Sequence, residues 1–152
     1  MIARELNILP SHLYPPEEWA MAEEDFSSRW MGNAETIFAL SNGYFGIRGT
    51  FEEGRPAVQA GAFVNGFHET WPIVHAEEAY GFAKTGQTMV NVPDATVLKL
   101  YVDDEPLFLP TARLIDYRRE LDFRDGIKRR RLTWASPAGK HVTVTSRRMV
   151  SF

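Results

Sequence analysis

The stretch RLIDYRRELDFR, residues 113–124, decides the fold class because its side chains alternate between two faces. One face carries four apolar residues: Ile115, Tyr117, Leu121 and Phe123. The other face carries five charged residues: Asp116, Arg118, Glu120, Asp122 and Arg124. A period of two predicts a β-strand with one face on a hydrophobic core, and Arg119 is the exception on the apolar face.

Turn signals on both sides of this strand extend it into a sheet. Asp125-Gly126 is a tight-turn signal between two apolar runs. The other predicted strands are residues 97–102, 127–134 and 141–152, with further turns at 103–106 and 136–139. We therefore expect a meander of at least four antiparallel strands within residues 95–152. The last strand pattern reaches Phe152 without a turn, so we expect a sheet that is truncated there and keeps an unpaired edge.

The first half of the chain carries a hairpin signal. Residues 36–40 form a short apolar run, and Asn42-Gly43 separates it from a second run at residues 44–51. Asn-Gly favours a two-residue β-turn because both central positions need positive φ. Residues 61–67 predict another short strand.

The expected organisation is one β-domain with a lead-in. Residues 1–33 are irregular and acidic, and Pro15-Pro16 favours the start of a short helix. We therefore predict a short irregular or helical lead-in at residues 1–33. Residues 34–152 are then a partial antiparallel β-sandwich, and the class is all-β.

Composition narrows the function classes. The chain has 152 residues, a net charge of −3 and no cysteine, which excludes disulfide scaffolds, thiolate nucleophiles and cysteine-based zinc sites. No general basic field exists to hold nucleic acid, and no apolar run approaches the ~18 residues of a membrane span. No signal peptide is visible at the N-terminus. We expect a cytoplasmic protein with no nucleic-acid or membrane partner.

Adjacent carboxylates are poor candidates for a catalytic dyad. A glycosidase needs two carboxyl groups that face each other across the scissile bond. The candidate pairs are Glu52-Glu53, Glu77-Glu78 and Asp103-Asp104. Neighbouring side chains in a strand point to opposite faces, and those in a turn point to water. We therefore predict solvated turn residues and no catalytic residue in this chain.

Other chemical motifs are also weak. The four histidines are far apart in sequence, without metal-ligand spacing, so we predict no metal site. No Gly-x-Ser-x-Gly elbow occurs, and the glycines at 43, 46 and 49 lack the helix that follows a phosphate loop. The basic run Lys128–Arg131 lies in a predicted strand, and we expect it to form cross-strand ion pairs. The expected partners are Asp116, Glu120, Asp122 and Asp125.

Residues 68–93 are predicted to be a long loop because they show little periodicity. The loop holds the candidate site residues Trp71, His75, Tyr80 and Phe82. Aromatic rings there can stack on the apolar faces of sugars. The commoner role of such rings is to pack the loop onto its own sheet or onto a second domain, and the sequence favours that role.

Five segments in the same order and spacing resemble glycoside hydrolase family 65. They are residues 36–49, 61–67, 102–106, 121–126 and 136–140, so the resemblance covers nearly all of residues 35–152. It implies an N-terminal β-supersandwich of the galactose-mutarotase type, a linker, an (α/α)6 barrel and a small C-terminal sheet. Members include maltose, trehalose, kojibiose and nigerose phosphorylases and some hydrolytic trehalases.

The resemblance also implies what this chain does. The phosphorylases cleave α-linked glucose disaccharides with inorganic phosphate, as co-substrate and without another cofactor, to give β-glucose 1-phosphate. Their general acid lies in the barrel, so the N-terminal domain is non-catalytic and the fragment alone is expected to be inactive. The expected partners are its own barrel, which carries the disaccharide, and a second subunit in a homodimer. Trp71, His75, Tyr80 and Phe82 are then candidates for the active-site rim or an interdomain contact.

Two other readings stay open. The chain is either an independent carbohydrate-binding β-sandwich module that uses residues 68–93, or the N-terminal domain of a hydrolytic trehalase. Neither the linkage of the disaccharide nor the choice between phosphorolysis and hydrolysis follows from this sequence.

Overall fold

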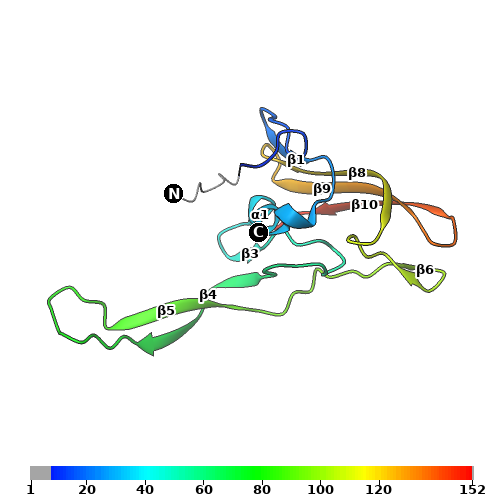
Figure 1. Ribbon diagram of the computed structural model, residues 1–152. Helices are drawn as coiled ribbons and strands as arrows, with labels where there is room; N and C mark the ends of the chain where they lie inside the picture. Colours follow the sequence, from blue (N-terminus) through cyan, green and yellow to red (C-terminus); the bar gives the residue numbers. More distant parts are fainter. Residues whose placement is uncertain (1–7, 152) are drawn as a thin grey trace, which may run out of the picture.

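The computed structural model describes residues 8–151, and its regular structure is mainly β, which confirms the predicted class (Figure 1). Residues 1–7, the start of the predicted lead-in, and Phe152 lie outside the described residues. The strands are β1 (Ala20–Glu23), β2 (Leu40–Ser41), β3 (Phe45–Ile47), β4 (Ala62–Pro72), β5 (Thr85–Asn91), β6 (Tyr101–Val102), β7 (Glu105–Pro106), β8 (Arg113–Asp122), β9 (Ile127–Ala135) and β10 (His141–Arg148). A 3-10 turn η1 (Ser28–Trp30) leads into the helix α1 (Met31–Ile37).

Sheet A has the strand order β1-β8-β9-β10 and is antiparallel throughout. Its β8-β9-β10 part is the predicted meander, and the turn at Asp125-Gly126 is confirmed, with Gly126 at φ 66°. The fourth strand is not the predicted strand 97–102 but β1, which pairs Ala22 with Glu120. Among the described residues, β10 has no neighbour on its second side, so the predicted unpaired edge is confirmed.

The lead-in therefore contributes a strand where a helix start was expected. Residues 15–19 hold no helix, and Pro16 instead forms an isolated bridge with Met21. Ala22 and Glu23 of this strand are both buried. The edge of β8 offers backbone partners that an isolated short helix would lack, and tertiary pairing overrides the local proline signal.

Sheet B has the order β2-β3-β4-β5. The predicted hairpin at Asn42-Gly43 is confirmed, with Leu40 opposite Ile47, but of the two turn residues only Gly43 has a positive φ, of 89°. The predicted strand 36–40 is wrong, because Thr36 and Ile37 end helix α1. Trp30, Ala34 and Phe38 are all buried, and their spacing of four residues gives a helical face that outweighs the short apolar run.

The predicted loop 68–93 is wrong at both ends, because β4 and β5 form a long hairpin that extends away from the rest of the molecule (Figure 1); between these two strands only residues 73–84 are a loop. We call residues 65–91 the arm. Trp71 pairs with Gly86, and the register shifts between Phe63 and His68. That irregularity, together with residues exposed on both faces of the ribbon, removes the alternation by which a strand is recognised in sequence.

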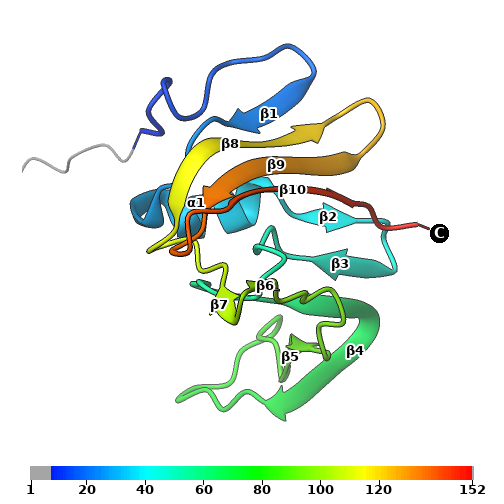
Figure 2. The ribbon, with the colours of Figure 1, turned by 90° about the vertical axis from the view of Figure 1, so that its right-hand side faces the viewer.

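The predicted strand 97–102 shrinks to β6, which pairs only with β7 in a two-stranded sheet. Asp103 and Asp104 form the turn between them with φ of 53° and 64°. Leu98 instead donates its backbone N–H to the carbonyl oxygen of Glu52 at 2.6 Å. Figure 2 shows β6 and β7 between sheet A and the arm.

The core has two apolar clusters under the inner face of sheet A. The first contains Tyr14, Trp30, Ala34, Phe38, Leu40, Ile47, Ala62 and Leu121. The second contains Phe51, Leu107, Leu109, Tyr117, Leu132 and Trp134. Of the predicted apolar face of β8, Tyr117 and Leu121 are buried, whereas Ile115 and Phe123 are exposed. Ile115 lies at a bulge between Leu114 and Asp116, and Phe123 lies beyond the end of β8.

No helix in residues 8–151 is both long and apolar enough to cross a membrane.

Candidate functional site

Four cationic side chains point inward from sheet A. Arg119 lies on β8, Lys128 and Arg130 on β9, and Arg148 on β10. Cross-strand pairing places Arg119 opposite Arg130, and Lys128 opposite Arg148. All four are buried, and they face the segment Gly49–Glu53 and strand β1. We call these cations and their carboxylate partners Glu23, Glu52 and Glu53 the clamp.

Arg119 is the centre of one half of the clamp. Its Nη2 lies 2.7 Å from Oε2 of Glu23, and its Nη1 donates to the Gly49 carbonyl at 2.9 Å. Its guanidinium stacks on Phe38 at 4.2 Å and on Phe51 at 4.4 Å, and thereby joins the two apolar clusters. The residue that breaks the alternation of β8 is thus fully buried.

Glu23 also accepts two phenolic hydroxyls. Tyr14 donates to its Oε1 at 2.7 Å, and Tyr117 donates to its Oε2 at 2.6 Å. Burial, reinforced by the neighbouring carboxylate, raises the pKa of Tyr14 and of Tyr117 well above the ordinary value. Both phenols therefore stay protonated and act as hydrogen-bond donors to Glu23.

Glu52 and Glu53 form the other half of the clamp. Arg130 binds Glu53 with both terminal nitrogens, at 2.8 and 2.5 Å, and its Nε lies 3.1 Å from Glu52. Lys128 lies 3.3 Å and Arg148 3.6 Å from Glu52. The expectation that Glu52-Glu53 is a solvated turn is wrong, since the two residues are only 7% and 6% exposed. The segment that carries them packs on the cationic inner face of sheet A. The ion pairs formed there offset the free-energy cost of burying the two carboxylates.

The basic run of β9 divides between the two faces of the sheet. The prediction of ion pairs with the acidic strand face is confirmed for Arg129, which pairs with Asp122 and Asp125, and for Arg131, which pairs with Asp116. It is wrong for Lys128 and Arg130, which turn inward to the clamp. Glu120 pairs with Arg118, not with the run.

The clamp does not have the charge state of a glycosidase dyad. Burial tends to raise the pKa of Glu52, but the charges of Lys128, Arg130 and Arg148 lower it to about 2. A general acid needs a carboxyl group whose pKa is raised so that it keeps its proton. Glu52 is ionised across the physiological range, and its chemistry is structural.

The remaining carboxylate pairs and the histidines are dispersed. Glu77-Glu78 is exposed in the arm, and Asp103 forms an ion pair with Lys140 at 2.6 Å. Residues 8–151 contain no group of three or more His, Asp or Glu side chains that could hold a metal ion.

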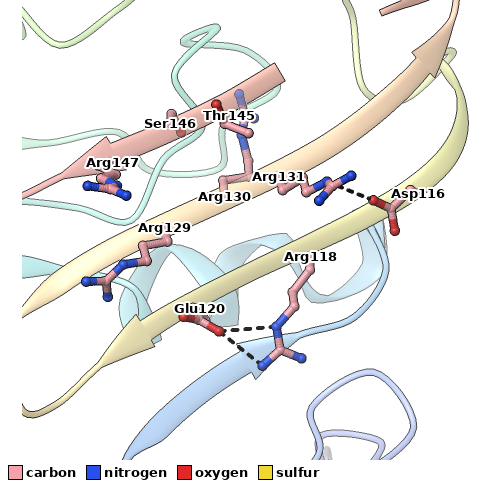
Figure 3. A pocket seen from close by; sticks show the side chains of 9 residues that line it. All are labelled: Asp116, Arg118, Glu120, Arg129, Arg130, Arg131, Thr145, Ser146 and Arg147. Carbon is pink, nitrogen blue, oxygen red and sulfur yellow. Dashed lines mark hydrogen bonds and ion pairs between the residues drawn. The ribbon is translucent and has the colours of Figure 1, made fainter. Parts of the chain in front are cut away.

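A hollow of about 800 Å³ lies on the outer face of sheet A (Figure 3). It is lined by Asp116, Arg118, Glu120, Arg129, Arg130, Arg131, Thr145, Ser146 and Arg147. Its two carboxylates each face a guanidinium, Asp116 with Arg131 and Glu120 with Arg118. Each carboxylate is thus held by a guanidinium on the same face of the sheet.

The structure places the four sequence-predicted site residues along the arm. The Trp71 indole lies over Gly86, where an added Cβ would come within 2.5 Å of the ring. His75 and Phe82 meet near the tip with ring centroids 4.9 Å apart, and His75 Nε2 lies 2.8 Å from the Ala83 carbonyl. Tyr80 is fully exposed. The structure thus brings His75 and Phe82 together in a hollow that neither Trp71 nor Tyr80 lines.

The sequence reasoning missed other exposed apolar residues of the arm. Phe67, Val74 and Met89 are 61%, 90% and 49% exposed. A long ribbon with large apolar groups on its surface and both faces in water is only marginally stable alone. Their signal in the sequence was the density of apolar residues in a segment with no strand period.

Comparison with known proteins identifies the family. Residues 21–152 match the family model described as the N-terminal domain of glycosyl hydrolase family 65. The chain is 45% identical to an α,α-trehalose phosphorylase of Thermoanaerobacter brockii and covers 18% of that protein, with 91% of this chain aligned. It is 32% identical to a kojibiose phosphorylase of Caldanaerobacter subterraneus subsp. tengcongensis, with 88% of this chain and 16% of that protein aligned.

A solved structure described as a putative kojibiose phosphorylase from human microbiome has a TM-score of 0.76 and 26% identity, over 91% of this chain and 18% of that one. The chain thus spans less than a fifth of the length of these relatives. The resemblance found in the five sequence segments is confirmed. The chain belongs to glycosyl hydrolase family 65 and corresponds to its N-terminal domain.

Proposed function

We propose that this chain is the non-catalytic N-terminal domain of a phosphorylase that acts on α-linked glucose disaccharides with inorganic phosphate and no other cofactor. The observation that carries the proposal is the family match, together with relatives that are phosphorylases about five times longer. The carboxylates of the clamp are paired with cations of the same chain, which supports a scaffold role. The reaction then takes place in an (α/α)6 barrel on the same protein.

The arm is the part of the domain that we propose contacts the rest of the enzyme. Trp71, Tyr80 and Phe82 are 45%, 107% and 48% exposed, and together with His75 they supply an aromatic surface without a core beneath it. Large exposed apolar surfaces mark contact sites for other domains or subunits. The arm packs on the barrel, at the rim of the sugar site, or on the second subunit of a homodimer.

The reaction is tested by the product of the full-length protein. Trehalose, kojibiose and maltose are each incubated with and without inorganic phosphate, and β-glucose 1-phosphate is measured. Release of the phosphate ester that depends on phosphate supports the proposal. Release of free glucose alone, without dependence on phosphate, would assign the chain to a hydrolytic trehalase.

The arm is tested by alanine substitutions at Trp71 and Tyr80 in the same protein. Phe123→Ala is the control, since Phe123 is an exposed aromatic residue outside the arm, directly after β8, with an exposure similar to that of Trp71. We expect the arm variants to raise the KM for the disaccharide or to shift the dimer toward monomer, and the control to do neither. Arm variants with unchanged KM, kcat and oligomeric state would contradict the role of the arm.

A second candidate function is an independent carbohydrate-binding module, which the exposed arm aromatics favour. Isothermal titration of the isolated chain with maltose, kojibiose and trehalose separates the two. Saturable binding that Trp71→Ala abolishes would support the module. Under the scaffold proposal, the isolated chain shows no binding.

A further inference from the structure

The clamp contains one more positive charge than negative charge. Its cations are Arg119, Lys128, Arg130 and Arg148, and its carboxylates are Glu23, Glu52 and Glu53. A buried excess charge is costly because the surrounding apolar groups solvate it poorly. Arginine does not release its proton in proteins. Lys128 is therefore the one cation of the clamp that can release a proton and so remove the excess positive charge.

Every element packed around Lys128 contributes a charged or polar group. Strand β8 contributes Arg119, its own strand β9 contributes Arg130, and β10 contributes Arg148 directly opposite. The segment before the arm contributes Glu52 at 3.3 Å and the Thr50 carbonyl, to which Lys128 Nζ donates at 3.2 Å.

The other two carboxylates are committed elsewhere. Glu23 binds Arg119, Tyr14 and Tyr117, and Glu53 binds Arg130. The amine of Lys128 thus has one anionic neighbour and several cationic ones. The protonated form of this amine is therefore less stable than the protonated form of a surface lysine.

We propose that the clamp is a proton-sensitive fastening between sheet A and the segment Gly49–Glu53, held tightest when the Lys128 amine is neutral and loosened when that amine takes up a proton. Proton uptake converts the amine to an ammonium and restores the buried excess charge. Burial, with the charges of Arg148 and Arg119, outweighs the attraction of Glu52 and lowers the pKa of Lys128 to about 7. The change of state therefore falls near neutral pH.

The fastening acts on the root of the arm. The backbone carbonyl oxygen of Thr50 accepts hydrogen bonds from both Lys128 and Arg148. The backbone carbonyl oxygen of Glu52 accepts one from the backbone N–H of Leu98. Residues 50–52 precede β4 and residue 98 follows β5, so the clamp ties together the two chain segments that lead into and out of the arm. Loosening it frees both segments together.

Hydrogen exchange in the full-length protein tests the proposal. Backbone amides of residues 49–54 and 95–98 are followed between pH 6 and pH 9, and rates are corrected for the intrinsic effect of pH on exchange. An opened clamp gives Lys128 its ordinary pKa of 10.5, so the open state binds more protons between the two pKa values. Opening should then become roughly tenfold rarer for each pH unit above about 7.

Two variants and one control test whether the Lys128 amine is the group that causes the pH dependence of exchange. Lys128→Met and Lys128→Arg both remove the pH dependence, and Lys128→Arg also keeps the amides poorly protected at pH 9 because its charge is permanent. Lys140→Met is the control, since Lys140 is an exposed lysine paired with Asp103; it should keep the wild-type slope. A flat wild-type profile, or a slope that survives in the Lys128→Arg variant, would overturn the proposal, and neither outcome requires the Met variant to fold.

Discussion

The inner face of sheet A and the arm differ in what their side chains contact. In sheet A, even the charged residues Arg119, Lys128 and Arg130 are buried and find partners within the chain. In the arm, aromatic and aliphatic side chains such as Tyr80 and Val74 stand in water. The first region pairs its buried charges within the chain, and the second leaves apolar area uncovered. Changes in the clamp should therefore affect folding, whereas changes in the arm should affect what the domain contacts.

The sharpest test of the self-contained clamp is Arg119→Met. This change removes the ion pair with Glu23 and the donor to the Gly49 carbonyl, and it leaves Glu23 buried without its cation. Breaking a buried pair in this way costs about 3–5 kcal/mol. Urea unfolding followed by tryptophan fluorescence measures the loss.

Arg118→Met is the matched control for that test. Arg118 is the neighbouring residue on the outer face, where it pairs with Glu17, Glu24 and Glu120 and its side chain is 38% exposed. Partly exposed ion pairs contribute about 0–1 kcal/mol. Equal losses for the two variants would show that the two faces of sheet A do not differ as described.

Acid should weaken the clamp through Glu52. Its pKa is about 2 in the folded chain and 4.5 ordinarily, so the unfolded chain binds the proton more readily between these values. The stabilisation is fully present above pH 4.5 and is lost as the pH falls toward 2, with a total on the order of 3 kcal/mol. Urea unfolding at a series of pH values measures the slope.

Glu52→Gln should flatten that acid limb and lower stability at neutral pH, because the buried cations lose a counter-charge. Glu78→Gln, in the exposed tip of the arm, should follow the wild-type curve. An acid limb of unchanged slope in Glu52→Gln would assign it to other carboxylates.

Close packing beside the clamp leaves no room for a side chain at Gly49. An added Cβ would lie 2.7 Å from the backbone carbon of Phe38 and 2.9 Å from the carbonyl oxygen of Ala34. Backbone atoms cannot yield as a flexible side chain can, so Gly49→Ala should cost about 1–3 kcal/mol. Gly46→Ala is the control, because its Cβ would meet the nearest atom at an ordinary 3.5 Å. A smaller unfolding midpoint shift at Gly49 than at Gly46 would refute the packing argument.

Sequence reasoning predicted the fold class and the antiparallel meander because β8 to β10 follow local rules of alternation and tight turns. It failed where tertiary contacts decide. Arg119 broke the apolar face of β8, and this exception was a true signal of a buried charge. Its partners came from β1 and Gly49–Glu53, which no local pattern connects to β8.

The sequence singled out residues 68–93 by their aromatic density but did not predict their form. In the structure, Trp71, Tyr80 and Phe82 of this segment are exposed. Its form as a hairpin depends on cross-strand pairs such as Trp71 with Gly86, which lie 15 positions apart and follow a shift of register. Likewise, Glu52-Glu53 was predicted to be a solvated turn because the two residues are neighbours in sequence. The cationic side chains that bury them lie on β9 and β10, far away in sequence.

The smallest effect on stability is expected at Trp71. Its indole covers Gly86 across the arm but remains 45% exposed, so Trp71→Ala should change the free energy of unfolding by less than about 1 kcal/mol. Leu132→Ala, in the second apolar cluster, is the contrast, because that side chain is fully buried and its loss should cost about 2–5 kcal/mol. Urea unfolding of the two variants side by side measures the difference. If Trp71→Ala were as damaging as Leu132→Ala, the arm would be part of the folding core, and its exposed aromatic surface would no longer indicate a contact site for the rest of the enzyme.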